Sequence, residues 1–174
     1  AGYVGLVSGA CFSEFGVEVV CVDKDVQKVG LLNNHQVPIY EPELDVIVEK
    51  NIKAGRLSFA SDVEASVKNV DAVFIAVGTP SRRGDGHADL TFVYEVAREI
   101  APAMNGYTVV VTKSTVPVGT GDEIEKILLD LCSDNSFDVV SNPEFLREGS
   151  AINDFMRPDR VVIGTKSKKA QEVM

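Results

Sequence analysis

The sequence of 174 residues predicts an α/β fold in which parallel strands alternate with helices. Short runs rich in β-branched residues recur along the chain, and the clearest are residues 72–77 and 108–112. These runs are almost wholly apolar, as strands covered by helices on both faces usually are. Segments with helical periodicity separate the runs, and no linker or short repeat interrupts the series. We therefore expect one domain, residues 1–174, built on a doubly wound parallel sheet.

The first half of the chain predicts helices and short strands with recognisable ends. Gly16 and Gly55 each follow a helical pattern, because glycine is favoured just after a helix. Asp25 can cap a short helix through its carboxylate. The expected elements are a helix at 3–15, a strand at 17–22, a helix at 29–32, a helix at 44–52, a strand at 56–59 and a helix starting at 61–62.

The second half predicts the stronger strands. Residues 108–112 are threonine and valine only, and this run of β-branched residues is one of the two clearest strand predictions. The expected elements are strands at 72–77, 108–112, 137–141 and 160–164, with helices at 90–104 and 122–131. Ligands of such sheets bind outside the carboxyl ends of the strands, so the loops that follow each strand are the candidates for chemistry.

The composition excludes several classes of function. A net charge of -9 argues against nucleic-acid or anionic-membrane binding, which require a basic face. No apolar run reaches the length of a membrane span, and no signal peptide is recognisable. Three scattered cysteines without C-x-x-C spacing predict buried thiols in a reducing, cytoplasmic compartment. The two histidines are isolated, so no metal site is expected.

The first residues carry a phosphate-binding pattern. Gly2-Tyr3-Val4-Gly5 matches the rear part of a G-x-G-x-x-G turn, whose first glycine and preceding strand are expected before Ala1. Glycines there let the backbone approach a pyrophosphate at the helix N-terminus. Asp23 follows a predicted strand about 20 residues further on, as the Rossmann dinucleotide fingerprint requires.

The turn and the acid together predict a Rossmann-type domain that binds NAD. The carboxylate of Asp23 can accept hydrogen bonds from a ribose diol, and its charge disfavours the 2′-phosphate of NADP. Lys24 and Lys28 weaken that exclusion slightly. The alternatives are a tight turn that holds no ligand, and an Asp23 that serves only as a helix cap.

Polar residues also follow the strands of the second half. After residues 72–77, Gly78 permits close approach, and Thr79 and Ser81 offer hydroxyls to a sugar or a phosphate. Ser114 and Thr115 follow the next strand, where a hydroxyl can position water, bond a cofactor amide or simply cap a helix.

The loop at residues 142–149 is the richest in candidate groups. Glu144 and Glu148 are four residues apart and fall on one face if the segment is helical. Such a pair can divide its roles, with one carboxylate in proton transfer and the other on a sugar hydroxyl. The alternative is a surface segment organised by an ion pair of Arg147.

These motifs together resemble the UDP-glucose 6-dehydrogenase family, within the UDP-glucose/GDP-mannose dehydrogenases. The resemblance covers nearly the whole chain, in family order, through Gly2-Tyr3-Val4-Gly5-Leu6, Pro38-Ile39-Tyr40-Glu41-Pro42, Val77-Gly78-Thr79-Pro80, residues 113–120, residues 142–149 and Asp154-Phe155. It implies oxidation of the C6 alcohol of UDP-glucose to a carboxylate by two NAD⁺ in sequence, through a thiohemiacetal and a thioester on a cysteine.

The resemblance also implies roles for particular residues. Thr115 would help to order the catalytic water, and Glu144 would handle protons at the thioester. NAD would contact Gly2, Tyr3, Val4, Gly5, Asp23, Lys28, Val77, Gly78, Thr79, Pro80, Ser81, Ser114 and Glu148. The sugar nucleotide would contact Glu144, Phe145, Leu146, Arg147 and Glu148.

One family motif, Gly-Phe-Gly-Gly-x-Cys with the nucleophilic cysteine, is absent from the sequence. The assisting lysine and the dimerising helix of the family are likewise expected beyond Met174. We therefore expect the cofactor-binding part of a homodimeric enzyme of polysaccharide biosynthesis, inactive by itself. The alternatives are a GDP-mannose or UDP-N-acetylmannosamine dehydrogenase, and a non-catalytic nucleotide-binding module.

Overall fold

The computed structural model describes residues 1–82, 84, 86–132 and 136–174. They form two compact units, one made of Ala1–Asp62 with Phe145–Arg160 and the other of Val63–Glu144 with Val161–Met174. We call them the first and the second unit. Each combines helices with strands that pair in parallel, which confirms the predicted α/β fold class.

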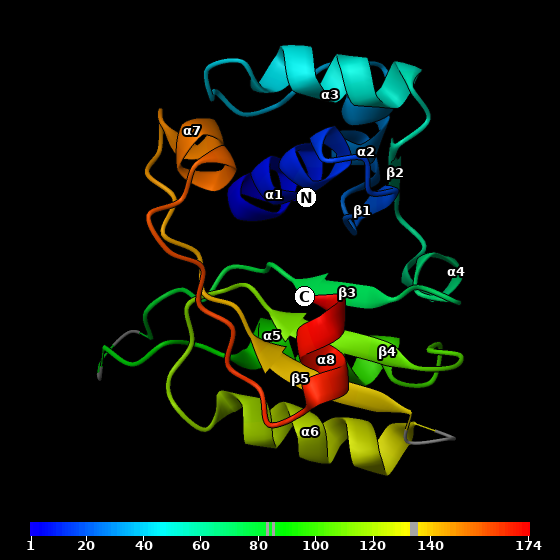
Figure 1. The fold of residues 1–174 in the computed structure, drawn as a ribbon, viewed down its shortest axis with the longest axis vertical. Coiled ribbons are helices and arrows are strands. Elements are labelled where there is room, and N and C mark those ends of the chain that lie inside the picture. The colour runs from blue at the N-terminus through cyan, green and yellow to red at the C-terminus, as the bar shows by residue number, and fades with distance from the viewer. Residues whose placement is uncertain (83, 85, 133–135) are drawn as a thin grey trace. The chain divides into compact units, whose positions relative to one another are not determined.

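The first unit contains a two-stranded parallel sheet and four helices. Strand β1 pairs along its whole length with β2, from Val19 opposite Leu57 to Val22 opposite Ala60. The elements are α1 (Tyr3–Glu14), β1 (Val19–Val22), α2 (Val26–Asn33), α3 (Leu44–Lys53), β2 (Leu57–Ala60) and α7 (Ala151–Met156). Figure 1 shows α1 among the other elements of this unit.

Helix α1 is apolar along nearly all of its length, because it is buried rather than amphipathic. Its residues 6–11 are all buried, and they share one core with residues from α2, α3, β2 and α7. Gly9 lies against β1, where the Sγ atom of Cys21 occupies the space that a Cβ at position 9 would need. The predicted end of the helix is confirmed by Gly16, whose φ of +96° is the left-handed conformation that glycine favours after a helix.

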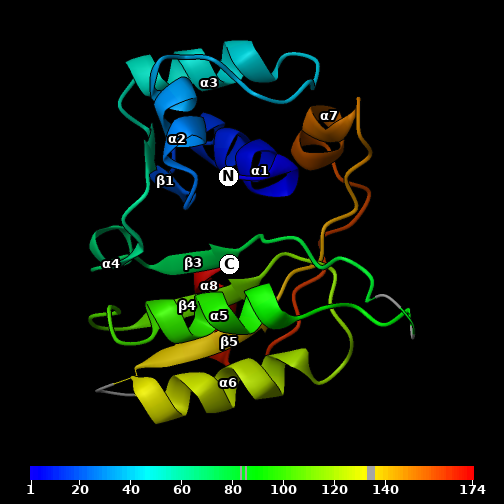
Figure 2. The same cartoon turned by 180° about the vertical axis from the view of Figure 1, so that it is seen from behind.

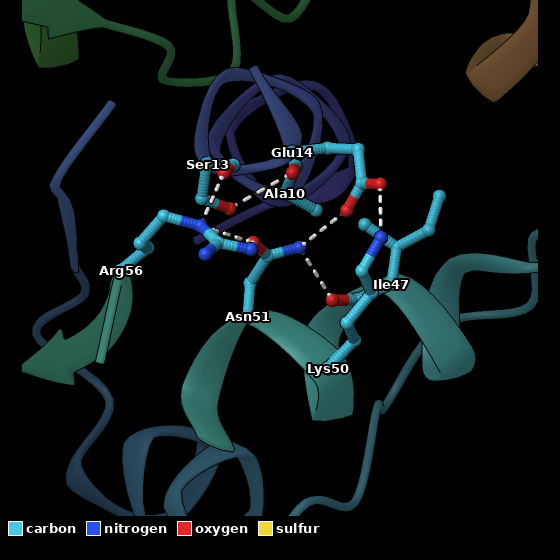
Figure 3. A network of polar contacts seen from close by, with 7 residues as sticks. All are labelled: Ala10, Ser13, Glu14, Ile47, Lys50, Asn51 and Arg56. Atoms are coloured by element: carbon cyan, nitrogen blue, oxygen red, sulfur yellow. Dashed lines mark hydrogen bonds and ion pairs between the residues drawn. The ribbon is translucent and has the colours of Figure 1, made fainter. Parts of the chain in front are cut away.

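A polar network fixes the end of α1 to α3 and to the start of β2 (Figure 3). Asn51 is fully buried, and its Nδ2 donates to Glu14 Oε2 and to the carbonyl of Ile47, each at 2.9 Å. Its Oδ1 accepts from Nε and Nη2 of Arg56 at 3.0 and 2.7 Å. Arg56 also donates to the carbonyl of Ser13, at 2.9 Å. Both ends of the Asn51 amide are therefore satisfied, as burial requires.

The second unit is built on a three-stranded parallel sheet in the order β3-β4-β5. All five residues of the central strand are buried, so this strand is covered on both faces. Val110 belongs to the core with α5 and α6, whereas Val109 and Val111 belong to the core with α8. The elements are α4 (Val63–Ser66), β3 (Ala72–Ile75), α5 (Thr91–Ile100), β4 (Thr108–Thr112), α6 (Thr120–Leu131), β5 (Phe137–Ser141) and α8 (Lys168–Val173).

Figures 1 and 2 show the two faces of this sheet from opposite sides. Helices α5 and α6 cover one face, and α8 lies against the other. Each parallel strand pair is joined by a helix that crosses over, α5 between β3 and β4 and α6 between β4 and β5. The carboxyl ends of the three strands therefore meet at one edge, which brings their following loops together.

The predicted strand at residues 160–164 is wrong. This segment makes only one bridge, in which Ser141 and Gly164 exchange backbone hydrogen bonds of 2.9 and 2.8 Å in antiparallel orientation. The side chains of Val161, Val162 and Ile163 are exposed. Composition alone predicted a strand here, but among the residues that the structure describes this segment pairs only at Gly164. The short helices α7 and α8 were not predicted.

Substitution of Gly9 tests the close contact of α1 with β1. An alanine Cβ would overlap Cys21 Sγ, and overpacking of this kind costs about 1–3 kcal/mol. The better helix propensity of alanine offsets up to about 1 kcal/mol of this loss in the free energy of unfolding. We expect Gly9→Ala to lower the free energy of unfolding by about 1–2 kcal/mol in denaturant titrations. Gly30→Ala in α2, where the new Cβ meets nothing within 4 Å, is the control and keeps or raises stability.

Candidate functional site

The turn before α1 is suited to an anion. Gly2 is exposed and extended, with φ of -74° and ψ of -174°, and its carbonyl accepts the N–H of Leu6 at 2.8 Å. The N–H groups of the first helical turn have no acceptors within the helix, and they lie at the positive end of its dipole. An ideal Cβ on Gly2 would meet no atom within 4 Å, so the space beside the turn is open. The geometry fits a phosphate group.

Asp23 follows β1 directly, and its carboxylate is engaged on both oxygens. Oδ1 accepts the N–H of Asp25 at 3.0 Å, and Oδ2 lies 2.7 Å from Nζ of Lys28. Burial alone would raise the pKa of Asp23, but the hydrogen bonds from Lys28 and from the N–H of Asp25 outweigh it and lower the pKa. Asp23 therefore carries a full charge, and Lys28, the other predicted NAD contact of this region, lies beside it.

Glu41 is a polar residue of the first unit whose importance the sequence reasoning missed. Only 5% exposed, its carboxylate accepts hydrogen bonds from the hydroxyl of Tyr3 at 2.5 Å and from the N–H groups of Gly149 and Ala151 at 2.7 and 2.8 Å. Its one signal in the sequence is its place in the Pro38–Pro42 motif of the resemblance. The donors are 38, 108 and 110 residues away, so no local pattern could reveal them.

The loop at residues 145–148 presents side chains with distinct environments. Arg147 holds Asp154 with two nitrogens, Nε and Nη2, at 3.0 and 2.7 Å, which raises the pKa of Arg147 and lowers that of Asp154. This ion pair matches the alternative interpretation of Arg147. Phe145 is half exposed and carries the guanidinium of Arg160 over its ring at 5.0 Å. Leu146 packs on the core, and Glu148 is exposed.

In the second unit, the loops after β3 and β4 are joined by hydrogen bonds. The hydroxyl of Ser114 donates to the carbonyl of Val77 at 2.6 Å. The hydroxyl of Thr79 donates to the carbonyl of Thr115 at 3.3 Å. Gly78, Pro80 and Ser81 follow in the same loop, in which Gly78 and Ser81 are exposed. The structure thus brings together the predicted residues of two strand-end loops.

The loop after β5 joins the same edge through a buried lysine. Lys113 is only 7% exposed, and its Nζ donates to Oδ1 of Asn142 at 3.0 Å. The N–H of Asn142 in turn donates to the carbonyl of Thr112 at 2.9 Å. Burial lowers the pKa of Lys113, and the nearby charge of Glu144 opposes that effect. Lys113, Asn142 and Glu144 therefore form a charged group at the carboxyl end of the sheet.

The hypothesis that Glu144 and Glu148 share one helical face is wrong. Residues 142–147 form a loop, and a turn follows at residues 148–150. The backbone donors are used elsewhere, because Asn142 N–H pairs with Thr112 and Arg147 N–H bonds the carboxylate of Asp154 at 3.0 Å. Glu144 belongs to the second unit and Glu148 to the first.

Two further observations concern the described part of the chain. Residues 1–82, 84, 86–132 and 136–174 contain no group of three or more His, Cys, Asp or Glu side chains placed to hold a metal ion. Within the same residues, no helix combines the length and the apolar character that crossing a membrane requires.

Comparison with protein families decides the relationship of this chain. The family model described as the UDP-glucose/GDP-mannose dehydrogenase family, NAD binding domain, matches residues 1–174. The chain belongs to this family. The matched part is the family's NAD-binding domain, which confirms the cofactor that the turn and Asp23 predict.

Individual relatives agree with the family model. A UDP-glucose 6-dehydrogenase of Rhizobium meliloti is 61% identical over 176 residues, covering 100% of this chain and 40% of that protein. The structure of a UDP-glucose dehydrogenase from Pyrobaculum islandicum matches 98% of this chain and 40% of its own, with a TM-score of 0.94 and 42% identity. The structure of a GDP-mannose dehydrogenase from Pseudomonas aeruginosa matches 99% of this chain and 41% of its own, with a TM-score of 0.89 and 38% identity. The chain spans about 40% of the length of these relatives.

The charge of Asp23 makes a testable contribution to stability. Its pKa in the folded chain lies below the ordinary 3.8, so the ionised form stabilises the fold above about pH 4, and this stabilisation is lost as the pH falls toward 2. We expect the stability lost in Asp23→Asn to be largest near about pH 6 and to shrink progressively as the pH is lowered below about 5. Urea unfolding without nucleotide, over a series of pH values, measures this difference. The same deficit at every pH would contradict it. The exposed Glu18→Gln is the control.

Proposed function

We propose that this chain is the NAD-binding part of a UDP-glucose 6-dehydrogenase. The observation that carries the proposal is the edge of the second unit, where hydrogen bonds of Ser114 and Lys113 join three strand-end loops. Those loops carry hydroxyls, a lysine and a carboxylate, which are groups that can bind a sugar alcohol and accept its proton. The identity of 61% to a relative named for this activity supports UDP-glucose as the substrate.

The groups of the first unit fit a dinucleotide. We propose that the backbone of Gly2, Tyr3, Val4 and Gly5 holds the pyrophosphate and that Asp23 accepts the adenosine ribose, with Lys28 orienting its carboxylate. The remaining proposed contacts are Val77, Gly78, Thr79, Pro80, Ser81, Ser114 and Glu148. When bound, NAD⁺ supplies the hydride acceptor of the oxidation.

The catalytic proposal concerns Thr115 and Glu144. Thr115 is exposed in the loop after β4, where its hydroxyl can order a water molecule. Glu144 can accept a proton from that water. We propose that the sugar nucleotide contacts Glu144, Phe145, Leu146, Arg147 and Glu148. Arg147 is held by Asp154. We therefore expect Arg147 to contribute to binding by shaping the loop and by its positive charge at the loop surface.

The organisation of the whole protein is part of the proposal. The family model that spans residues 1–174 supports one NAD-binding domain made of both units. We propose that the protein acts as a homodimer in the cytoplasm, in polysaccharide biosynthesis. The three free cysteines support a reducing compartment.

Loss of the Asp23 carboxylate tests the cofactor site. We expect Asp23→Asn to weaken NAD⁺ binding about tenfold or more, because a charge-assisted hydrogen bond to the ribose contributes about 1.5–3 kcal/mol. Isothermal calorimetry on the full-length protein measures this affinity, with the exposed Glu18→Gln as the matched control. An unchanged affinity for NAD⁺ in Asp23→Asn would show that Asp23 does not bind the ribose.

Turnover tests the substrate. We expect the full-length protein to form two NADH per UDP-glucose consumed, and residues 1–174 alone to form none. Absorbance of NADH measures both, and GDP-mannose and UDP-N-acetylmannosamine are the comparison substrates. Faster turnover of either one would replace UDP-glucose in the proposal. Binding of NAD⁺ by the full-length protein without turnover of any sugar nucleotide would favour a non-catalytic nucleotide-binding module.

A further inference from the structure

Glu41 is a buried charge whose burial needs an explanation. Its carboxylate is 5% exposed, in the segment between α2 and α3. Taking an ionised carboxylate out of water is costly unless donors replace the lost hydration. A surface segment of this kind would ordinarily place a glutamate in solvent. The hydrogen-bond donors around Glu41 therefore identify the segments that this residue holds together.

Three segments that are distant in sequence supply these donors. The hydroxyl of Tyr3, in the first turn of α1, donates to Oε2 at 2.5 Å. The N–H of Gly149 donates to the same oxygen at 2.7 Å, and the N–H of Ala151 donates to Oε1 at 2.8 Å. All of these residues belong to the first unit. One carboxylate thus links the turn before α1 to the chain that leads into α7.

The carboxylate of Glu41 is ionised. Its hydrogen-bond partners among the described residues are neutral groups. Burial alone would raise the pKa of Glu41. The hydrogen bonds from Tyr3 and from the N–H groups of Gly149, Ala151 and Ile152 outweigh burial and lower the pKa below its usual value. The full negative charge therefore acts on neutral donors, and such charge-assisted hydrogen bonds are stronger than neutral ones.

Both linked segments carry proposed ligand contacts of the first unit. Tyr3 is the first residue of α1 and belongs to the stretch assigned to the NAD pyrophosphate. Gly149 directly follows the loop 145–148, which is assigned to the sugar nucleotide, and its φ of +84° is a conformation that favours glycine. Glu41 contacts both segments but belongs to neither.

We propose that Glu41 is a positioning residue that couples NAD binding at the turn before α1 to the conformation of the loop 145–148. The coupling rests on the proposed function, because the ligand assignments come from it. NAD that orders the turn also orders Tyr3, which holds Glu41 and, through it, the N–H of Gly149. A ligand shifts a conformational equilibrium only if it binds one of the two states more tightly. Here NAD would bind more tightly to the state in which the link from Tyr3 through Glu41 to Gly149 is formed. Couplings of this kind change an affinity by roughly fivefold or more.

Hydrogen exchange of the full-length protein tests the coupling with NAD⁺ as the only ligand. We expect saturating NAD⁺ to slow amide exchange of residues 145–151 by roughly fivefold in the wild type. Calorimetry establishes saturation for each variant, so a change of affinity is not mistaken for a loss of coupling. No sugar nucleotide is present, and the measurement does not depend on which one the enzyme uses.

Two variants separate the coupling from a purely structural role. In Tyr3→Phe, Glu41 keeps its backbone donors, so we expect wild-type exchange of residues 149–151 without ligand but no slowing by NAD⁺. In Glu41→Gln, an amide N–H₂ faces a backbone N–H, and we expect exchange at Gly149 and Ala151 to be roughly tenfold faster with or without NAD⁺. The controls are Glu43→Gln and Tyr40→Phe, two exposed neighbours, which behave as the wild type.

The outcomes distinguish this proposal from the proposed function. NAD⁺ binding without any slowing of exchange at residues 145–151 overturns the coupling and leaves the dehydrogenase assignment intact. Equal slowing in the wild type and in Tyr3→Phe overturns the link through the Tyr3 hydroxyl, even if Glu41→Gln fails to fold. Failure of the wild type to bind NAD⁺ overturns both proposals.

Discussion

Parallel pairing of β3, β4 and β5 is the constraint on which the candidate site of the second unit depends. Strands that run in the same direction all end at one edge, so polar residues separated by about 30 residues in sequence meet without any local pattern that joins them. The central strand contributes most, because its burial on both faces fixes Lys113 and Ser114 directly beyond its end. A surface strand would hold these side chains less rigidly.

The sequence was most informative where one physical effect dominates. Residues 108–112 are all β-branched and all buried, so composition and tertiary environment agree. Residues 161–163 are also all β-branched but remain exposed, and the prediction of a strand failed there because β-branched composition does not supply a pairing partner. The helices α7 and α8 are six residues each, too short for a periodic pattern to emerge.

The candidate site was predictable to a similar degree. Gly2 and Asp23 follow from the spacing of a turn and an acid, because that spacing reflects a compact strand–helix unit. Glu41 and the bond between Lys113 and Asn142 were not predictable, since their partners are brought close only by the completed fold. Both are buried charges held by neutral hydrogen-bond partners, and single-sequence reasoning has no rule that detects such an arrangement.

The thiols under and within α1 have a consequence for reactivity. Cys11 is fully buried and Cys21 is covered by Gly9 of the helix, and burial raises their pKa values to about 12 and about 11. The attacking form of a cysteine is the thiolate, which neither residue forms near neutral pH. We therefore expect aldehydes, peroxides and alkylating reagents to react slowly with these two thiols.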